Sequence, residues 1–360
     1  MKAVILVGGK ATRLLPLTCN RPKAMMPVLN RPFLEYVFRH LTAHGVTDIV
    51  LAQGYLAESL QSYLGDGARF GARLYYSNED SPLGTAGAVK NAERYLDGHF
   101  LVLNGDIVTT LDIKAMVDFH SKRKAKLTIA LTPVEDPTAY GLVETDAQGR
   151  ISRFLEKPKP NEITTNLINA GTYIVEQEVL SQIAPGRAVS FEREVFPNLV
   201  TRKEPVYAYP SSAYWIDMGT PEKYLQLNRD LLTGKCPAYL TDKNSAIDKS
   251  ADIHPTAEIK GPVVIGISCN IGRTVKIIGP TVIGNGCTIQ DDSLVDSSVL
   301  WQNIRLDTEV KVANSIIGDN CRLESGSICE NAVLGDNVTV KAGCKVEPAS
   351  KIYPGETVGA

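Results

Sequence analysis

The residues best suited to chemistry lie near the start of the chain, where two glycines and two cations follow a short apolar run. Residues 4–7 are rich in β-branched side chains and end at Gly8-Gly9, and Arg13 and Lys23 follow. Paired glycines after a buried strand let backbone N–H groups approach a phosphate and form an anion-binding nest. The two cations add positive charge at the same place. The segment therefore predicts a site for a nucleoside triphosphate or a similar polyanion.

A second candidate is the carboxylate of Asp106, which follows Asn104-Gly105 at the end of an apolar run. A carboxylate at the end of a strand can reach a Mg²⁺ ion that bridges phosphate oxygens, because magnesium prefers oxygen ligands and takes few of them from protein. The same composition is typical of an ordinary turn. The residue pattern alone leaves both interpretations open.

The elements that must position these residues alternate between strand-like and helix-like patterns. Apolar runs at 49–54 and 99–106 predict strands, and apolar stripes with helical spacing run from Leu34 to Leu41 and from Ala88 to Leu96. This alternation predicts an α/β fold, a Rossmann-like and mostly parallel sheet with helices on both faces. Ligands of such sheets bind beyond the carboxyl ends of the strands, where the glycine pair and residues 104–106 would meet.

The order of motifs resembles the sugar-1-phosphate nucleotidyltransferases, which make nucleotide sugars from a nucleoside triphosphate. Their signature GGxGTRLxPLT corresponds to GGKATRLLPLT, with Ala11 where glycine is usual, and alanine is small enough for the loop to survive. Further matches follow in the family's order: PKAMMP, LGTAGA, NGD, DPTAYG, FLEKP, LINAGTYI, EREVFP and WIDMGTP. The whole set is most similar to the mannose-1-phosphate guanylyltransferase branch.

The resemblance implies three groups of site residues. The nucleotide site would comprise Leu6, Gly8, Gly9, Lys10, Ala11, Thr12, Arg13, Gln53, Glu79, Gly84, Thr85, Asn104 and Gly105. The sugar phosphate would contact Gly141, Glu156, Lys157, Asn169 and Gly171. Arg13, Lys23 and Asp106 would be catalytic, and Asp106 and Asp217 would bind Mg²⁺.

The implied reaction is transfer of a nucleotidyl group from a nucleoside triphosphate to a sugar 1-phosphate, with GTP and mannose 1-phosphate as the expected pair. Glu79 could accept hydrogen bonds from guanine, but related uridylyltransferases also carry acids near this position. A glucose-1-phosphate thymidylyl- or uridylyltransferase is therefore the alternative. A non-catalytic regulatory paralogue, or an acyltransferase using His254, would fit less of the sequence.

From about residue 244 the pattern changes to one aliphatic residue in every six. Ile247, Ile265 and Ile283 recur 18 residues apart, as expected for a parallel β-helix with three short strands per coil. This part resembles the left-handed hexapeptide-repeat β-helices, with a phase slip expected around 299–304. The predicted organisation is a catalytic domain at 1–235, a linker at 236–243 and a β-helix at 244–360. We expect the β-helix to serve oligomerisation or regulation, so that truncation near residue 242 leaves the chemistry largely intact.

Composition narrows the partners. The chain of 360 residues has 38 basic and 40 acidic residues, a net charge of −2, which argues against a nucleic-acid surface. Apolar runs fall short of the roughly 20 residues that span a bilayer. Seven cysteines without a C-x-x-C pair indicate reduced thiols rather than disulfides or zinc. We therefore expect a cytoplasmic homo-oligomer whose partners are small phosphorylated substrates.

Overall fold

The structure is a computed structural model that describes residues 1–54, 56–237 and 246–359. The chain divides into two compact units: Met1–Gly9 joins Val37–Trp215 in the first, and Lys10–Tyr36 joins Ile216–Ala360 in the second. The segment after the paired glycines therefore packs with the C-terminal part of the chain. Most of the predicted linker at 236–243 lies outside the described residues.

A mixed nine-stranded sheet forms the centre of the first unit. The order along the sheet is β10-β9-β11-β6-β1-β4-β5, and β8 pairs with both β11 and β12. The predicted parallel strands are present as β1 (Lys2–Leu6), β4 (Asp48–Gln53) and β6 (His99–Asn104), and β5 (Arg73–Asn78) adds a parallel strand that was not predicted. The other strands of this sheet are β8 (Leu127–Pro133), β9 (Gly141–Thr145), β10 (Ile151–Glu156), β11 (Leu167–Glu176) and β12 (Val206–Pro210). The short strands β7 (Ile107–Thr109) and β13 (Trp215–Asp217) lie outside it. β11 runs antiparallel to β6 and β8, so the parallel half of the sheet ends at β6.

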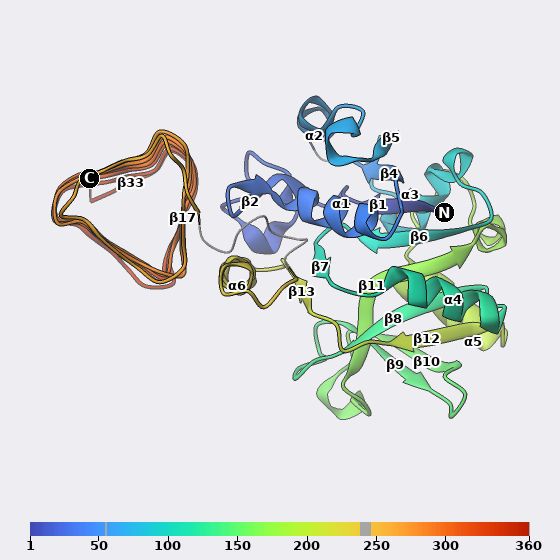
Figure 1. The fold of residues 1–360 in the computed structure, drawn as a ribbon. Coiled ribbons are helices and arrows are strands. Elements are labelled where there is room, and N and C mark those ends of the chain that lie inside the picture. The colour runs from blue at the N-terminus through green and yellow to red at the C-terminus, as the bar shows by residue number, and fades with distance from the viewer. Residues whose placement is uncertain (55, 238–245, 360) are drawn as a thin grey trace. The chain divides into compact units, whose positions relative to one another are not determined.

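Both faces of the sheet are buried. Val4, Val50 and Val102 belong to one apolar cluster that includes α3 and α5, while the alternating residues Ile5 and Leu51 are fully buried on the other face. The helices are α1 (Phe33–Ala43), α2 (Ala57–Leu64), α3 (Gly84–Asn91), α4 (Ile113–Arg123) and α5 (Phe196–Thr201). Figure 1 shows α4 lying across β8 and β12. Within the described residues, no helix is long and apolar enough to cross a membrane.

Of the two predicted helical stripes, one is a helix throughout and the other is interrupted by a short helical turn. The stripe from Leu34 to Leu41 is α1, as predicted. The stripe from Ala88 to Leu96 is only partly helical, because α3 ends at Asn91 and a 3-10 turn follows. The short turns are η1 (Thr12–Leu14), η2 (Lys23–Met25), η3 (Ala68–Phe70), η4 (Glu93–Tyr95), η5 (Pro160–Glu162), η6 (Gln177–Gln182) and the π-helix η7 (Phe191–Val195).

The second unit begins with a small hairpin packed on a helix. β2 (Pro27–Val28) and β3 (Arg31–Pro32) pair around a two-residue turn at Leu29 and Asn30. Both turn residues have positive φ, 44° and 64°, as a type I′ turn requires. The backbone N–H of Leu29 donates to Asn228 Oδ1 (3.0 Å), which ties the hairpin to α6 (Pro221–Leu232).

The rest of the second unit is the left-handed parallel β-helix that the six-residue period predicts. Each face is one parallel sheet. The first contains β14 (Ala246–Ile247), β17 (Val263–Ile265), β20 (Thr281–Ile283), β23 (Val299–Leu300), β26 (Ile316–Ile317), β29 (Val333–Leu334) and β32 (Lys351–Ile352). The second contains β15 (Asp252–Ile253), β18 (Asn270–Ile271), β21 (Thr288–Ile289), β24 (Arg305–Leu306), β27 (Arg322–Leu323), β30 (Thr339–Val340) and β33 (Thr357–Val358). The third contains β16 (Glu258–Lys260), β19 (Lys276–Ile278), β22 (Leu294–Asp296), β25 (Lys311–Ala313), β28 (Ile328–Glu330) and β31 (Lys345–Val346).

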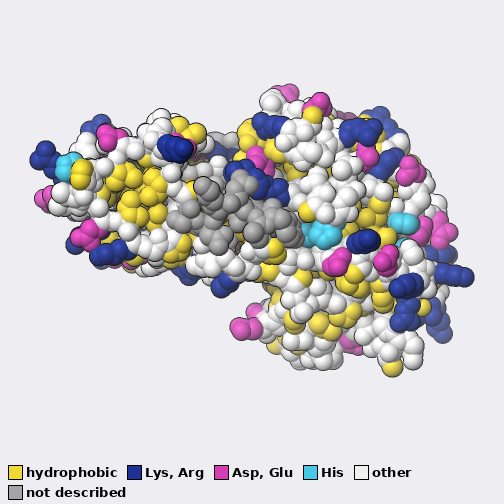
Figure 2. All heavy atoms as spheres, in the orientation of Figure 1, with side chains coloured by type: hydrophobic (Ala, Val, Ile, Leu, Met, Phe, Trp, Pro, Cys, Tyr) yellow, Lys and Arg dark blue, Asp and Glu magenta, His cyan; other side chains and the backbone are white. Residues whose placement is uncertain are grey.

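The phase slip lies one corner earlier than predicted. Ile265 pairs with Ile283, 18 residues on, but Ile283 pairs with Leu300, 17 residues on. The lost residue belongs to the corner at Ser297-Ser298. The bulge or loop predicted at residues 300–303 is absent from this described segment, because β23 and β24 keep regular pairing. Figure 2 shows apolar side chains in the middle of the β-helix end that faces the viewer, with charged side chains around them.

Candidate functional site

The carboxyl ends of β1 and β6 meet closely in the first unit. The backbone N–H of Gly105 donates to the carbonyl of Leu6 (3.0 Å). A Cβ added to Gly105 would lie 2.5 Å from that oxygen and 2.6 Å from Val7 Cγ1, so only glycine fits here. Asn104 precedes this contact and the half-buried Asp106 follows it. The structure thus brings Leu6, Asn104 and Gly105 together as the sequence predicts.

Gln53 and Glu79 lie beside Gly8 at the same edge of the sheet. Gln53 is fully buried and its amide donates to Asn78 Oδ1 (2.8 Å). Glu79 Oε2 accepts from the backbone N–H of Leu83 (2.9 Å), and a Cβ on Gly8 would lie 3.2 Å from Glu79 Oε1. Burial raises the pKa of Glu79, and the hydrogen bond from Leu83 opposes this shift. The edge therefore offers a carboxylate and an amide next to the paired glycines.

Gly84 and Thr85 begin α3 against the segment around Val189. Gly84 has a φ of 69°, and a Cβ there would lie 2.6 Å from the carbonyl oxygen of Val189, so the glycine serves close packing. Thr85 Oγ1 donates to Glu192 Oε2 (2.7 Å) and accepts from the backbone N–H of Phe191 (2.8 Å). The Thr85 hydroxyl is therefore committed to holding the π-helix η7 in place.

The five predicted sugar-phosphate residues lie on the antiparallel half of the sheet. A Cβ on Gly141 would lie 3.0 Å from Glu156 Oε2, which places these two side by side on β9 and β10. Burial, and then the neighbouring Glu192, raise the pKa of Glu156. Lys157 follows with an exposed side chain and a φ of 54°.

The remaining two form a bulge in β11. Asn169 Oδ1 accepts from the backbone N–H of Gly171 (2.8 Å), and its amide donates to Tyr173 Oη (2.8 Å). Gly171 has a φ of 66°, and a Cβ there would lie 2.7 Å from Asn104 Nδ2. Asn169 thus shapes the bulge, which brings the predicted sugar side next to the end of β6.

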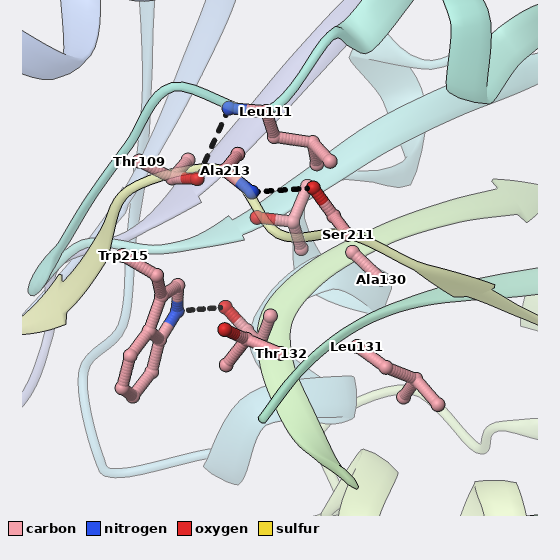
Figure 3. Close-up of a pocket in the computed structure, with 10 residues that line it drawn as sticks. Thr109, Leu111, Ala130, Leu131, Thr132, Ser211, Ala213 and Trp215 are labelled. Atoms are coloured by element: carbon pink, nitrogen blue, oxygen red, sulfur yellow. Dashed lines mark hydrogen bonds between the residues drawn. The ribbon is translucent and has the colours of Figure 1, made fainter. Parts of the chain in front are cut away.

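A small pocket in the first unit lies beside the same bulge (Figure 3). Thr109, Leu111, Ala130 and Thr132 contribute to its lining, together with Trp215, whose indole N–H donates to the carbonyl of Ala170 (2.9 Å). None of the lining residues is charged, so the pocket does not suit a phosphate.

The phosphate-loop segment continues in the second unit with η1. Ala11 adopts a left-handed conformation, with φ 48° and ψ 48°, at a cost of roughly 1–2 kcal/mol for a residue with a Cβ. Its carbonyl accepts from the backbone N–H of Leu14 (3.0 Å) and from Thr18 Oγ1 (3.1 Å). The loop therefore keeps the geometry of glycine with alanine in its place. Lys10 and Thr12, on either side, are exposed.

Arg13 and Asp217 meet around Gly219. A Cβ added to Gly219 would lie 3.0 Å from Arg13 Nη2 and 3.3 Å from Asp217 Oδ2. Asp217 is only 6% exposed, and its other oxygen pairs with the ammonium of Lys223. A buried carboxylate flanked by two cations is an arrangement suited to binding a polyanion and its counterion.

The donor set fits magnesium but not a dedicated metal cage. Among the described residues no group of three or more His, Cys, Asp or Glu side chains is placed to hold a metal. Magnesium is commonly held by one or two carboxylates and completed by substrate phosphates and water. Asp106 and Asp217 are oxygen donors of that kind.

Comparison with known proteins agrees with this chemistry. Residues 2–234 match the family model described as nucleotidyl transferase, and residues 268–359 match the GMPPB C-terminal domain. The chain belongs to the nucleotidyl transferase family.

Two relatives and one solved structure illustrate the range of this nucleotidyl transferase family. The mannose-1-phosphate guanylyltransferase of Mycobacterium tuberculosis is 38% identical over 75% of this chain and 76% of its own length. The UTP–glucose-1-phosphate uridylyltransferase of Synechocystis is 35% identical over 85% of this chain and 84% of its own. HddC from Yersinia pseudotuberculosis, crystallised with GMP-PN, is 31% identical with a TM-score of 0.55 over 63% of this chain and 97% of that one.

Sequence reasoning about this nucleotidyl transferase missed two charged residues at the site. Glu192 accepts from Thr85 and from Ser190 Oγ (2.7 Å each) and lies 3.4 Å from Tyr173 Oη, so it links the start of α3 to β11. Its motif EREVFP carries the family likeness without indicating this role, and the π-helix that contains it is a feature often found at functional sites. Lys223, the partner of Asp217, lies on α6 and has no distinguishing pattern in the sequence.

Proposed function

We propose that this chain transfers a guanylyl group from GTP to mannose 1-phosphate, giving GDP-mannose and pyrophosphate. The observation that carries the proposal is the placement of the Arg13 guanidinium beside the buried Asp217 carboxylate at Gly219, in a chain of the nucleotidyl transferase family. The choice of GTP and mannose 1-phosphate is supported by the extent of the likeness to the mycobacterial guanylyltransferase.

In this reaction a phosphate oxygen of the sugar 1-phosphate attacks the α-phosphorus of GTP. A new P–O bond forms as the bond between the α-phosphorus and the bridging oxygen breaks, and pyrophosphate leaves with that electron pair. Little covalent work falls to the protein, so positioning and charge stabilisation dominate. The backbone at Gly8 and Gly9 would cradle the phosphates. Arg13 and Lys23 would offset the negative charge that develops on the leaving pyrophosphate.

Asp106 and Asp217 would hold a divalent cation, for which we propose Mg²⁺, and this ion neutralises phosphate charge when it is bound. Lys223 pairs with Asp217 and so holds the carboxylate in place. Its ammonium also keeps positive charge near the position proposed for the phosphates. The chain's own contribution would thus be two oxygen donors, of which Asp217 is oriented by the neighbouring Lys223.

The nucleobase would lie along Gln53 and Glu79. Gln53 Oε1 is buried without a hydrogen-bond partner among the described residues, and Glu79 presents a carboxylate beside Gly8. Both oxygens are acceptors, and guanine offers the N1–H and N2–H groups as donors. This complementarity supports GTP. The 85% coverage of this chain by a UTP-dependent relative makes uridylyl transfer the alternative.

The sugar phosphate would approach from the antiparallel half of the sheet. The exposed Lys157 would attract its phosphate against the repulsion of the triphosphate. Glu156 would accept from sugar hydroxyls beside Gly141. Asn169 uses one lone pair of its amide oxygen and one amide hydrogen within the bulge, so we assign it the shaping of Gly171, with one amide hydrogen and one oxygen lone pair left for the sugar.

We further propose that the chain works in the cytoplasm as a homo-oligomer through its β-helix, whose viewed end carries apolar side chains. The acyltransferase alternative through His254 is not favoured, because residues 2–234 match the nucleotidyl transferase family.

The test is pyrophosphate release in the presence of Mg²⁺, with GTP, dTTP, UTP, ATP and CTP each combined with mannose, glucose and N-acetylglucosamine 1-phosphates. We expect the highest turnover for GTP with mannose 1-phosphate. A maximum for another pair would overturn the substrate assignment and leave the reaction class standing. A folded protein that is inactive with every pair would overturn the reaction class as well.

A further inference from the structure

The segment that carries Lys23 is held by the β-helix within the second unit. Lys23 lies on the single-turn helix η2, whose own stabilisation amounts to two backbone hydrogen bonds, from Met25 to Pro22 (2.9 Å) and from Met26 to Lys23 (3.1 Å). One turn of 3-10 helix is too short to be stable alone. The contacts made by the neighbours of Lys23 therefore contribute to its position.

Arg21, two residues before Lys23, makes two of these contacts. Its guanidinium forms an ion pair with Asp319 of the β-helix and lies 4.6 Å from the ring centroid of Trp301. The Arg21 and Asp319 side chains are 22% and 18% exposed, and Trp301 is 1% exposed. An ion pair shielded to this degree, with a cation stacked on an aromatic ring, is stronger than an ordinary surface pair.

Trp301 extends the contact to the other side of the segment. Its indole N–H donates to Tyr224 Oη (2.9 Å), and that hydroxyl donates in turn to the carbonyl of Pro27. Lys23 therefore lies between two points that the β-helix controls, Arg21 directly and Pro27 through Tyr224. Outside these two points, Asn30 also donates to the carbonyl of Ile283 (2.8 Å).

The acids that face Arg21 are fixed by the β-helix itself. Asp319 Oδ1 accepts from the backbone N–H of Gln302 (2.9 Å), and Asp336 Oδ1 accepts from that of Asp319 (3.0 Å). At another corner of the β-helix, Asp291 Oδ1 likewise accepts from the backbone N–H of Arg273 (2.7 Å). Each of these aspartates thus uses one carboxylate oxygen to hold a corner of the β-helix. The second oxygen of Asp319 is the one that pairs with Arg21.

Arg21 is one of several groups that act on the charge of Asp336. Burial raises the pKa of Asp336, the hydrogen bond from the backbone N–H of Asp319 lowers it, the Asp319 carboxylate raises it, and Arg21 lowers it. Asn20 donates to Asp336 Oδ2 (3.4 Å). Two carboxylates from successive coils thus face one guanidinium, and the acids would repel each other without it.

We propose that Arg21 is a positioning residue through which the β-helix holds the Lys23 segment in its working geometry. The inference rests on the role proposed above for Lys23. It differs from the expectation that the chemistry is largely independent of the β-helix, because the contact lies within one chain and on the segment that would hold the triphosphate.

The test compares, in the full-length protein, the Arg–Asp pair that joins the Lys23 segment to the β-helix with an Arg–Asp pair that lies within the β-helix. Asp319→Asn and Arg21→Gln break the pair at the Lys23 segment, and the amide oxygen introduced by Asp319→Asn can still accept from the backbone N–H of Gln302. Asp307→Asn and Arg322→Gln are the controls, because Arg322 pairs with Asp307 (3.0 Å) on the β-helix alone. Each variant is examined by amide hydrogen exchange of residues 19–30 without substrate, and by kcat and KM on the best substrate pair of the wild type.

We expect faster exchange at 19–30 and about a tenfold or greater fall in kcat for Asp319→Asn and Arg21→Gln, since a shift of about 1 Å in a positioning group can cost 10²-fold. KM for the sugar phosphate should stay near that of the wild type. The double variant should be no worse than the poorer single variant, because both changes remove one interaction. The kcat of Arg21→Lys should lie between those of the wild type and of Arg21→Gln, since lysine keeps the charge but not the planar stacking.

Two results would overturn the inference. One is equality of the Arg21 and Asp319 variants with their controls in both exchange and kcat. The other is a rise in exchange throughout the chain, which would indicate general destabilisation instead of a local change. A wild type inactive with every substrate pair would count against the proposed function instead, and the exchange comparison would still decide whether the β-helix holds the segment.

Discussion

Replacement of Gly105 by alanine tests whether the close approach of β1 and β6 at their carboxyl ends sets the position of Asp106. The added Cβ would lie 2.5 Å from the Leu6 carbonyl oxygen and 2.6 Å from Val7 Cγ1. Ordinary contact begins near 3.4 Å, so about 0.9 Å must be gained by moving backbone. The Leu6 carbonyl accepts the hydrogen bond of Gly105 itself (3.0 Å), and it cannot withdraw without loosening the end of both strands.

The expected loss follows from that displacement. Relief of overpacking typically costs about 1–3 kcal/mol in the free energy of unfolding. Displacement of a positioned group by about 1 Å lowers turnover by roughly 10²-fold. We therefore expect Gly105→Ala to fold, with a moderately lower midpoint in urea and a kcat near 1% of the wild type.

Gly54→Ala is the matched control, because Gly54 ends the neighbouring strand β4 and a Cβ there would meet its nearest atom at 3.6 Å. The assay is pyrophosphate release at saturating substrate, with urea unfolding of both variants. The reasoning would be refuted by a Gly105→Ala enzyme within threefold of the wild type in kcat. It would equally be refuted by a Gly54→Ala enzyme as impaired as Gly105→Ala.

Three further predictions can be checked with the same protein. Lys23→Ala and Asp106→Ala should each lower kcat by at least about 10²-fold, the scale for losing one charge partner in the transition state, and an effect below threefold would remove that residue from the mechanism. Burial raises the pKa of Glu79 above its ordinary 4.5. The folded chain therefore binds the Glu79 proton more tightly than the unfolded chain does, and the free energy of unfolding falls as the pH rises and Glu79 loses this proton. Urea unfolding should therefore show Glu79→Gln gaining stability relative to wild type between about pH 4 and pH 7, and an unchanged difference would contradict this. A fragment ending at residue 241 lacks Asp319 and Trp301, so its kcat should fall by about tenfold or more, contrary to the expectation from sequence, and a fully active folded fragment would contradict the contact.

The features predictable from sequence are those with a local signal. One aliphatic residue in six is enough to place Ile265, Ile283 and their partners in one column. The position of the phase slip is not predictable in this way, because the lost residue falls at Ser297-Ser298, a corner of small polar residues where the pattern contains no aliphatic marker. Ser298 and the buried Ser315 use their hydroxyls to accept from backbone N–H groups one coil on (3.1 Å each), a role that no spacing reveals.

In the candidate site, too, residues in a local motif can be predicted from the sequence, whereas their contacts with one another cannot. Motifs identify Arg13 and Asp217 separately, since each lies in a recognisable string. Their proximity at Gly219, and the pairing of Asp217 with Lys223, depend on packing that a single sequence does not encode locally. The pair of Arg21 with Asp319 spans 298 residues and has no counterpart in any motif.

That long separation has a consequence for the order in which the chain matures on the ribosome. At synthesis rates of about 5–20 residues per second, Asp319 is made roughly 15–60 s after Arg21. The strands of the first unit are complete by then, but the segment from Lys10 to Tyr36 packs with residues made last. A nascent chain would therefore hold its phosphate-binding segment unfinished until translation nears its end, and catalytic competence would arrive with the final coils rather than with the domain that performs the reaction.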